Sequence, residues 1–301
     1  FQVTSKMPVW ELKEESDLER IFEEQLKRTG VEYFDYYLMH ALNDERYEFF
    51  KNCNAFNVAK NLKSEGSIKH IGISFHDTAD VLEKILAEQP EIEIVQIQFN
   101  YLDFESPTVQ SRKLYEVCRK YNKPILIMEP VRGGELANLP GKAKKIFDSL
   151  GRKYSYASYA IRYAASFEGV YMVLSGMSNL EQMKDNLSYM KEFKSFTPTE
   201  YEAVKKVADI LLALKGIACT SCRYCTAGCP KNIPIPDLFE CYNLKKKFND
   251  DSSKEKYEAY TRDKGKASDC ISCRQCEKVC PQNLSIVEYL KEAVEVFEKN
   301  D

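Results

Sequence analysis

The sequence predicts an α/β fold of the (β/α)8 barrel type, followed by a separate and mostly helical domain that is rich in cysteine. Two observations predict it. Residues 1 to about 175 alternate between short apolar runs and amphipathic stretches, which indicates a parallel sheet covered by helices. Eight of the eleven cysteines then lie in two tight groups within the last part of the chain. We therefore expect a barrel domain over residues 1–215 and a cysteine-rich domain over residues 216–301.

Six apolar runs are the predicted strands. They are Val3–Ser5, Phe34–Met39, Ile71–Ile73, Ile92–Phe99, Ile125–Ile127 and Val170–Leu174.

The stretches between the predicted strands have helical periodicity, and two further signals mark where helices begin. Ser16 with Glu19, and Thr197 with Glu200, have the spacing of a capping box, in which two side chains satisfy the free N–H groups of a helix start. The second of these helices is predicted to run to about Lys215.

Six strand–helix units leave two architectures open. A doubly wound open sheet can have six strands, whereas a closed barrel needs eight. No glycine-rich phosphate loop of the form G-x-G-x-x-G follows the first strand. Polar residues end almost every predicted strand, and in a barrel all of these ends meet at one rim where active sites are built. These residues are Lys6, His40, Ser74, Gln96 with Gln98, Glu129 and Ser175.

The barrel is therefore favoured, with its first two βα units missing. The sequence begins with Phe1 rather than Met, and Phe1–Thr4 has the pattern of a buried strand. We expect the chain to start inside a longer protein.

Composition and charge exclude several classes of function. The 301 residues are 44% hydrophobic and 30% charged, with a formal net charge of -3, so nothing favours a nucleic-acid partner. No apolar run reaches the length that spans a bilayer, and no signal peptide opens the sequence. The expected location is the cytoplasm, where clustered cysteines indicate metal ligation rather than disulfides.

The two cysteine groups share the pattern C-x2-C-x2-C-x3-C-P and form an internal duplication. They comprise Cys219, Cys222, Cys225 and Cys229, then Cys270, Cys273, Cys276 and Cys280. Structural zinc sites use one or two C-x2-C pairs with a longer spacer, so zinc fits poorly and two [4Fe–4S] clusters are predicted.

In two-cluster ferredoxins the fourth cysteine of each motif ligates the other cluster. We therefore expect one cluster on Cys219, Cys222, Cys225 and Cys280, and the other on Cys270, Cys273, Cys276 and Cys229. The remaining Cys53, Cys118 and Cys241 are expected to be small buried hydrophobes.

The barrel part also resembles a known family in a series of motifs whose order and spacing are more specific than any one of them. They are Val3–Lys6, Tyr36–His40, Ile71–Ser74, Val95–Asn100, Glu129–Gly134 and Ser175–Gln182 with Asp185–Asn186. This layout resembles the aldo-keto reductase family over residues 1 to about 190. With the cysteine-rich tail, it resembles the iron–sulfur branch of that family.

The resemblance implies reduction of a carbonyl by NADPH. The family uses a Tyr as general acid, a Lys that lowers the pKa of the Tyr, an Asp that pairs with the Lys, and a His that orients the carbonyl. Lys6 matches the Lys and His40 matches the His, whereas the Asp and the Tyr are expected upstream of Phe1. A cation beside a phenol lowers its pKa, and a neutral imidazole N–H polarises a carbonyl oxygen.

The resemblance also assigns residues to the cofactor NADP(H), with NAD as the alternative. Ser74 and Gln96 match the pair that holds the nicotinamide carboxamide, and Arg132 is expected near the pyrophosphate. At the adenosine end the matching residues are Ser178, Gln182, Asp185 and Asn186. Ser178 also has the simpler interpretation of a helix cap. Two positions depart from the family: Phe75 stands where Asn is frequent, and Met128 stands where an aromatic residue commonly stacks on the nicotinamide.

Three functions remain open at this point. The first is an NADPH-dependent reductase of aldehydes or ketones with a fused electron-transfer domain and a redox partner protein. The second is a non-enzymatic redox sensor with a nucleotide-binding barrel. The third is an electron carrier in which the barrel is a scaffold, and this one predicts no binding of nicotinamide.

Overall fold

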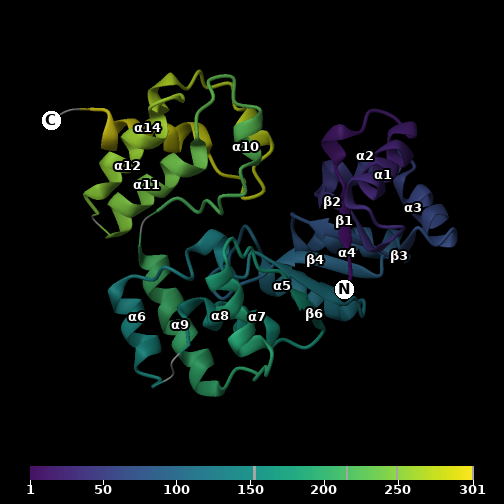
Figure 1. Cartoon of the computed structure of the whole chain (residues 1–301), viewed down its shortest axis with the longest axis horizontal. Coiled ribbons are helices and arrows are strands. Elements are labelled where there is room, and N and C mark those ends of the chain that lie inside the picture. Colours follow the sequence, from purple (N-terminus) through teal and green to yellow (C-terminus); the bar gives the residue numbers. More distant parts are fainter. Residues whose placement is uncertain (152–153, 215, 249, 300–301) are drawn as a thin grey trace. The chain divides into compact units, whose positions relative to one another are not determined.

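The computed structural model describes residues 1–151, 154–214, 216–248 and 250–299, which form two compact units (Figure 1). The first unit joins Phe1–Pro130 with Ala160–Phe196, and the second joins Val131–Tyr159 with Thr197–Asp301. The segment Val131–Tyr159 is thus part of the same compact unit as the cysteine-rich region. The domain boundary at residue 215 stays a prediction.

The first unit is built on a sheet of six parallel strands. The strands are β1 (Thr4–Met7), β2 (Phe34–Leu42), β3 (Ile68–Phe75), β4 (Ile94–Gln98), β5 (Ile125–Met128) and β6 (Val170–Val173). They are hydrogen-bonded in sequential order, and every neighbouring pair is parallel. A doubly wound sheet reverses its strand order at the centre, so the sequential order confirms the barrel-type prediction.

Helices follow the strands in this unit. They are α1 (Ser16–Thr29), α2 (Asp44–Asn52), α3 (Ala55–Ser64), α4 (Ala79–Glu88), α5 (Ser111–Lys120), α8 (Leu180–Met190) and, from Ala160 onward, α7 (Tyr156–Ala165).

The start of α1 corrects the predicted capping box. The Ser16 hydroxyl donates to Glu14 and does not cap the helix, and Glu15 at the N-cap makes no side-chain capping bond. The Asp17 carboxylate instead accepts the backbone N–H of Lys13 at 2.8 Å. Lys13 lies before α1, so this bond holds the preceding turn and does not cap the helix. N–H groups at the helix start bond to backbone carbonyls instead, Asp17 to Glu14 and Leu18 to Glu15.

The two outer strands of the sheet are partly exposed. Phe1 and Gln2 are exposed and β1 begins at Thr4, so the buried strand predicted over Phe1–Thr4 is wrong in its first residues. The Tyr171 hydroxyl of β6 donates to Gln2 Oε1 at 3.3 Å, and its ring lies 5.9 Å from the ring of Tyr36 on β2. The sheet therefore bends until a side chain of its last strand reaches Gln2, just before β1, and Tyr36 on β2, as barrel geometry requires.

A small cluster of buried side chains from three strands lies on this sheet. It consists of Tyr36, Leu38, Ile94 and Leu126. Gly72 on β3 lies against it, and a Cβ there would be 2.4 Å from Leu38 and 2.6 Å from Ile94. Only glycine leaves room for these neighbours.

The second unit is helical. Its helices are α6 (Gly141–Asp148), α9 (Pro198–Ala213), α10 (Tyr224–Ala227), α11 (Ile235–Phe248), α12 (Ser252–Thr261), α13 (Gln275–Lys278) and α14 (Ile286–Phe297), with 3-10 turns at Arg132–Gly134 and Ala267–Asp269. The capping box of α9 is confirmed, since Thr197 and Glu200 exchange both bonds. The helix ends at Ala213, and Lys215 lies outside the described residues.

The three cysteines outside the motifs are buried, as predicted. Cys118 and Cys241 are fully buried, and burial raises the pKa of each thiol to about 12. They therefore pack as neutral apolar side chains. Among the helices of the described residues, none combines the length and the apolar composition needed to cross a membrane.

Candidate functional site

Lys6 and His40 lie near the carboxyl ends of neighbouring strands in the first unit. Lys6 pairs in register with Leu38 on β2, two residues before His40. The register between β2 and β3 shifts between Met39 and Leu42, and Ala41 has a positive φ of 57°. A local irregularity of this kind redirects a side chain at the end of a strand, and such strain is frequent at functional sites.

The electrostatics of this pair suit a carbonyl. Burial lowers the pKa of Lys6 from its ordinary value. Burial first, and then the positive charge of Lys6, lower the pKa of His40 to about 3. His40 is therefore neutral at ordinary pH, which leaves one ring nitrogen with a proton that can be donated to a carbonyl oxygen.

Trp10 is a neighbour of this pair that the sequence reasoning missed. Its ring lies 4.9 Å from the His40 ring at an angle of 55°, while 53% of the residue remains exposed. It is the only tryptophan of the chain and follows Lys6 by four positions, which was the signal that the sequence offered. A half-exposed indole beside the histidine provides an apolar wall for a substrate.

Ser74 and Gln96 meet at the next two strand ends. They are register partners on β3 and β4, and Gln96 Nε2 donates to Ser74 Oγ at 3.3 Å. Gln96 is 4% exposed, and its Oε1 has no hydrogen-bond partner among the described residues. A buried carbonyl oxygen without a donor is costly, and a carboxamide NH2 group of a ligand would satisfy it. The pair therefore fits the amide of a nicotinamide ring.

Two further histidines flank these strands. His76 Nε2 lies 3.5 Å from Ser74 Oγ, and burial followed by the charges of Arg46 and Lys6 lowers its pKa to about 4. His70 is half exposed and its Nδ1 lies 3.1 Å from a Glu93 oxygen.

A buried polar network fixes the end of β4. Asp103 Oδ2 accepts from Gln98 Nε2 and from Asn100 Nδ2, both at 2.8 Å. Asn100 Nδ2 also donates to the Glu129 carbonyl at 3.0 Å, and Glu129 has a positive φ of 56°. The network thus holds the strand ends of β4 and β5 in one arrangement.

Replacing Asp103 by alanine is expected to lower the free energy of unfolding by about 2–4 kcal/mol, because two buried amides lose a charged acceptor. Urea denaturation monitored by circular dichroism measures this. The conservative variant Asp103→Asn retains one acceptor oxygen and should lose less. Equal losses in the two variants would contradict the role given to the carboxylate.

The residues predicted at the adenosine end are close together on and before α8, but they are engaged with one another. Gln182 Oε1 accepts from the backbone N–H of Ser178 at 2.7 Å, and Asn179 caps the helix by accepting the Gln182 N–H at 2.9 Å. Ser178 is therefore not the N-cap. Asn186 donates to the hydroxyl of Ser175 at 2.7 Å. Asp185 lies on the same helix, and a role for these residues toward a phosphate stays a prediction.

Arg132 has a carboxylate partner in the second unit. Its guanidinium pairs with Glu135, whose other oxygen pairs with Lys247 of α11. The charges of Arg132 and Lys247 outweigh burial and lower the pKa of Glu135. Gly133 has a φ of 62°, and a Cβ there would lie 2.5 Å from the Thr220 carbonyl oxygen. The close approach that this glycine permits is thus to the loop of the first cysteine motif.

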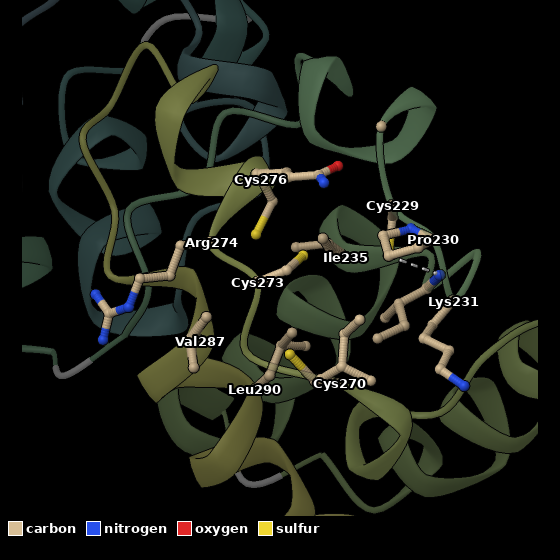
Figure 2. Close-up of a pocket in the computed structure, with 14 residues that line it drawn as sticks. Cys229, Pro230, Lys231, Ile235, Cys270, Cys273, Arg274, Cys276, Val287 and Leu290 are labelled. Atoms are coloured by element: carbon tan, nitrogen blue, oxygen red, sulfur yellow. Dashed lines mark hydrogen bonds between the residues drawn. The ribbon is translucent and has the colours of Figure 1, made fainter.

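The eight motif cysteines surround two cavities, each lined by four of them. One cavity, with an empty volume of about 330 Å³, is lined by Cys270, Cys273, Cys276 and Cys229. The other, of about 320 Å³, is lined by Cys219, Cys222, Cys225 and Cys280. Figure 2 shows the first cavity, with cysteine side chains gathered from two distant stretches of the chain. The structure thus brings together the crossed sets that the sequence predicts.

The two halves repeat their backbone as well as their sequence. Ser221 and Ser272 have φ values of 56° and 59°, and Arg223 and Arg274 have values of 65° and 58°. These left-handed residues alternate with the cysteines and curl each loop around its cavity. Burial first, and then nearby cysteines, raise the pKa of Cys225 to about 12.

The donor set fits an iron–sulfur cluster better than a single ion. Within the described parts of the chain, no three His, Cys, Asp or Glu side chains are arranged to hold one metal ion. Four thiols around a cavity instead suit a polynuclear centre that each sulfur meets at a different iron. Thiolates are also the soft ligands that such clusters require.

The comparisons with known proteins agree with both parts of this geometry. A model of the aldo/keto reductase family matches residues 1–209, and a model of the 4Fe-4S dicluster domain matches residues 218–284. The chain belongs to the aldo/keto reductase family. It is an oxidoreductase with a fused iron–sulfur domain. No curated protein matches it.

Solved structures of reductases share the fold. A thermostable aldo-keto reductase in complex with the inhibitor epalrestat is 22% identical, with a TM-score of 0.54 over 68% of this chain and 70% of that one. An aldo-keto reductase from Bacillus halodurans in its holo form is 21% identical, with a TM-score of 0.53 over 69% and 72%. An aldo/keto reductase from Klebsiella pneumoniae in complex with NADP and acetate is 19% identical, with a TM-score of 0.53 over 68% and 69%.

Proposed function

We propose that this oxidoreductase reduces an aldehyde or a ketone with NADPH, and that it carries two [4Fe–4S] clusters. The observation that carries the first part is the buried Gln96 Oε1, which has no donor among the described residues and lies next to Ser74. The neutral His40 beside Lys6 supplies the second half of the site, because it can orient a carbonyl oxygen.

The cofactor supplies a hydride to the carbonyl carbon when it is bound. The protein's own residues would bind the cofactor, orient the substrate and polarise its carbonyl group. Gln96 and Ser74 would hold the carboxamide, which fixes which face of the ring meets the substrate. The His40 N–H would polarise the carbonyl oxygen, and the Trp10 ring would cover an apolar part of the substrate. Lys6 would favour the ionised form of the acid that protonates the product oxygen.

Three further assignments belong to the same proposal. The adenosine end of NADPH would lie at α8, near Ser178, Gln182, Asp185 and Asn186, and Arg132 would approach the pyrophosphate. One cluster would be held by each crossed set of four cysteines. The cytoplasm is the proposed location, because free thiols persist in a reducing compartment.

The test of the activity is NADPH oxidation by the full-length natural protein, loaded with its clusters, against a panel of aldehydes and ketones. Turnover of at least one carbonyl supports the proposal. Tight NADPH binding without any turnover would favour a redox sensor instead. Absence of NADPH binding would leave the barrel as a scaffold beside an electron carrier.

The Gln96→Met variant is expected to bind NADPH about tenfold more weakly while it unfolds at the same or a higher temperature. The substitution keeps the volume of the side chain. It removes a buried oxygen without a partner, which relieves a cost in the free protein and offsets the loss of the Nε2 contacts to Ser74 and Met128. It also removes a contact in the complex. Fluorescence titration gives the Kd, and thermal denaturation gives the stability. An unchanged Kd would remove Gln96 from the cofactor site.

A further inference from the structure

The two cysteine cavities are related by the internal duplication, yet their surroundings differ. Position by position, Thr220 corresponds to Ile271, and Gln282 corresponds to Lys231, because each pair has the same spacing from its motif. Differences between such partners are not required by cluster binding, which both halves perform with the same cysteines. They therefore point to a task that only one of the two sites has.

The first difference is how deeply the residue after the first cysteine of each motif is buried. Thr220, beside Cys219, is 5% exposed, and Gly133 packs against its carbonyl so closely that a Cβ would lie 2.5 Å away. Ile271, beside Cys270, is 57% exposed. Cys222 and Cys273 are both exposed, so the difference lies in the residue next to the first cysteine of each motif. One cysteine loop is covered by the 131–135 segment, while the other presents an apolar side chain to solvent.

The second difference is charge. Lys231 lines the cavity of Cys229 and Cys270, whereas the neutral Gln282 lines the other cavity. Lys231 is exposed, and no carboxylate in the described part of the chain pairs with it. In Figure 2 the side chains of Lys231 and Arg274 extend away from the cysteines on opposite sides of the cavity.

The arginines of the two halves differ in the same direction. Arg223 makes two bonds to the buried carboxylate of Asp237, at 2.6 and 3.0 Å. Arg274 makes one bond to Glu277 at 3.1 Å and lies 3.9 Å from Glu288. The two side chains are similarly exposed, at 56% and 59%, but Arg223 is paired in a two-bond contact while Arg274 is less tightly paired.

We propose that the cluster held by Cys229, Cys270, Cys273 and Cys276 is the one that exchanges electrons with an external protein, a small one-electron carrier with an acidic docking face. Ile271 would form the apolar centre of the contact, and Lys231 and Arg274 its basic rim. In each encounter the carrier loses one electron and the cluster gains one, and no bond forms or breaks. The proposal rests on the clusters of the proposed function and does not require carbonyl reduction.

The charge argument favours an acidic carrier over a second copy of this chain. A patch with a free lysine and a loosely paired arginine repels its own copy and attracts a negative face. Redox encounters are small, and a few charges around an apolar contact set their association rate.

The test uses photoreduced flavodoxin, a small acidic one-electron carrier, mixed with the oxidised full-length protein in a stopped-flow instrument at low salt. Lys231→Gln is expected to lower the second-order rate about threefold to tenfold and to weaken its salt dependence. Ile271→Glu is expected to lower the rate and Ile271→Lys to raise it. In a second assay the reduced protein is oxidised by cytochrome c, a basic carrier. There Ile271→Glu should raise the rate of electron transfer and Ile271→Lys should lower it.

The matched control is Lys254→Gln on α12, which removes the same charge from an exposed position that lines neither cavity. Full bleaching by dithionite checks that every variant has both clusters. Equal rates for Lys231→Gln and Lys254→Gln would overturn the proposal, and so would a larger loss in Gln282→Glu than in Ile271→Glu. The assay contains neither NADPH nor carbonyl, so a reductase without activity would leave its result intact.

Discussion

Replacing Cys229 and Cys273 together by alanine is expected to leave about half of the iron in the protein, whereas replacing Cys229 and Cys222 together should remove nearly all of it. In the structure Cys229 and Cys273 line the same cavity, and Cys222 lines the other. A cluster that loses one ligand is destabilised, and a second loss at the same cluster adds little. When each of the two clusters loses one cysteine ligand, both clusters are lost.

Iron and acid-labile sulfide analysis of anaerobically purified protein measures the outcome. If each motif ligated its own cluster, Cys229 and Cys222 would share a site. The Cys229 and Cys222 double variant would then keep about half of the iron, and the Cys229 and Cys273 double variant would lose nearly all of it. The matched control is Cys53→Ala, which removes a buried thiol outside the motifs and should retain all of the iron. Retention of about half of the iron in the Cys229 and Cys222 double variant would contradict the crossed arrangement.

The grouping of the eight motif cysteines around two cavities could be predicted from sequence. The reason is that cluster ligation is encoded locally: three cysteines at fixed spacing need only one curled loop, and the duplication supplies it twice. The crossing of Cys229 and Cys280 is a tertiary feature, yet it follows from the same duplication because two related halves can exchange their fourth ligand. The structure places both in the cavities that this exchange requires.

The barrel was predictable as a class, and its site only in part. Strand–helix alternation gave the parallel sheet, and the polar strand ends gave Lys6, His40, Ser74 and Gln96. The position of Trp10 four residues after Lys6 was a weak signal, but its contact with His40 could not be predicted, because no local pattern reports which loop folds over which strand end.

Helix starts show the same limit on a smaller scale. At α1, Ser16 fits the capping pattern but bonds to Glu14, and at α8, Ser178 fits it while Asn179 makes the capping bond. Several polar residues compete for the same free N–H groups, and the backbone angles decide among them. At α9 the proline after Thr197 restricts those angles, and there the prediction is confirmed.

The ion-pair partners of Arg132 could not be predicted from the sequence. A basic residue after a strand end predicts a contact with phosphate, and this contact stays a prediction. The sequence does not reveal that Arg132 also pairs with Glu135, which in turn pairs with Lys247. The segment 131–135 is thus tied to α11 of the iron–sulfur part. Its neighbour Gly133 packs on the covered cysteine loop, so the segment that follows β5 is also the one that encloses one of the cluster sites.

Replacing Lys6 by methionine is expected to lower kcat for carbonyl reduction about a hundredfold to ten-thousandfold, the range typical for loss of acid–base assistance. NADPH binding should change little, since Ser74 and Gln96 remain. The control is Lys69→Met, which removes a surface lysine that lies over the Tyr33 ring at 4.4 Å. Equal kcat values in the two variants would exclude Lys6 from the chemistry.

The same variant makes a second prediction that does not depend on turnover. In the parent protein the pKa of His40 is about 3, because of burial first and the Lys6 charge second. Lys6→Met should therefore raise the pKa of His40, but not to its ordinary 6.5, since the burial remains. Titration of the His40 ring proton by NMR measures this. A pKa that does not move would show that the Lys6 charge does not act on the imidazole.

The sign of the pH dependence follows from that depressed pKa. Unfolded chains bind a proton at His40 near pH 6.5, whereas the folded protein does so only near pH 3, so acidification between these values favours unfolding. In the parent protein, activity that relies on neutral His40 should show no loss centred at 6.5. Stability should decline as the pH falls below 6.5 until the pH reaches the folded pKa of His40. That pKa is higher in Lys6→Met, so the decline should end at a higher pH and the total loss should be smaller. A stability profile that is identical in the two proteins would contradict the electrostatic coupling between Lys6 and His40 on which the proposed carbonyl site depends.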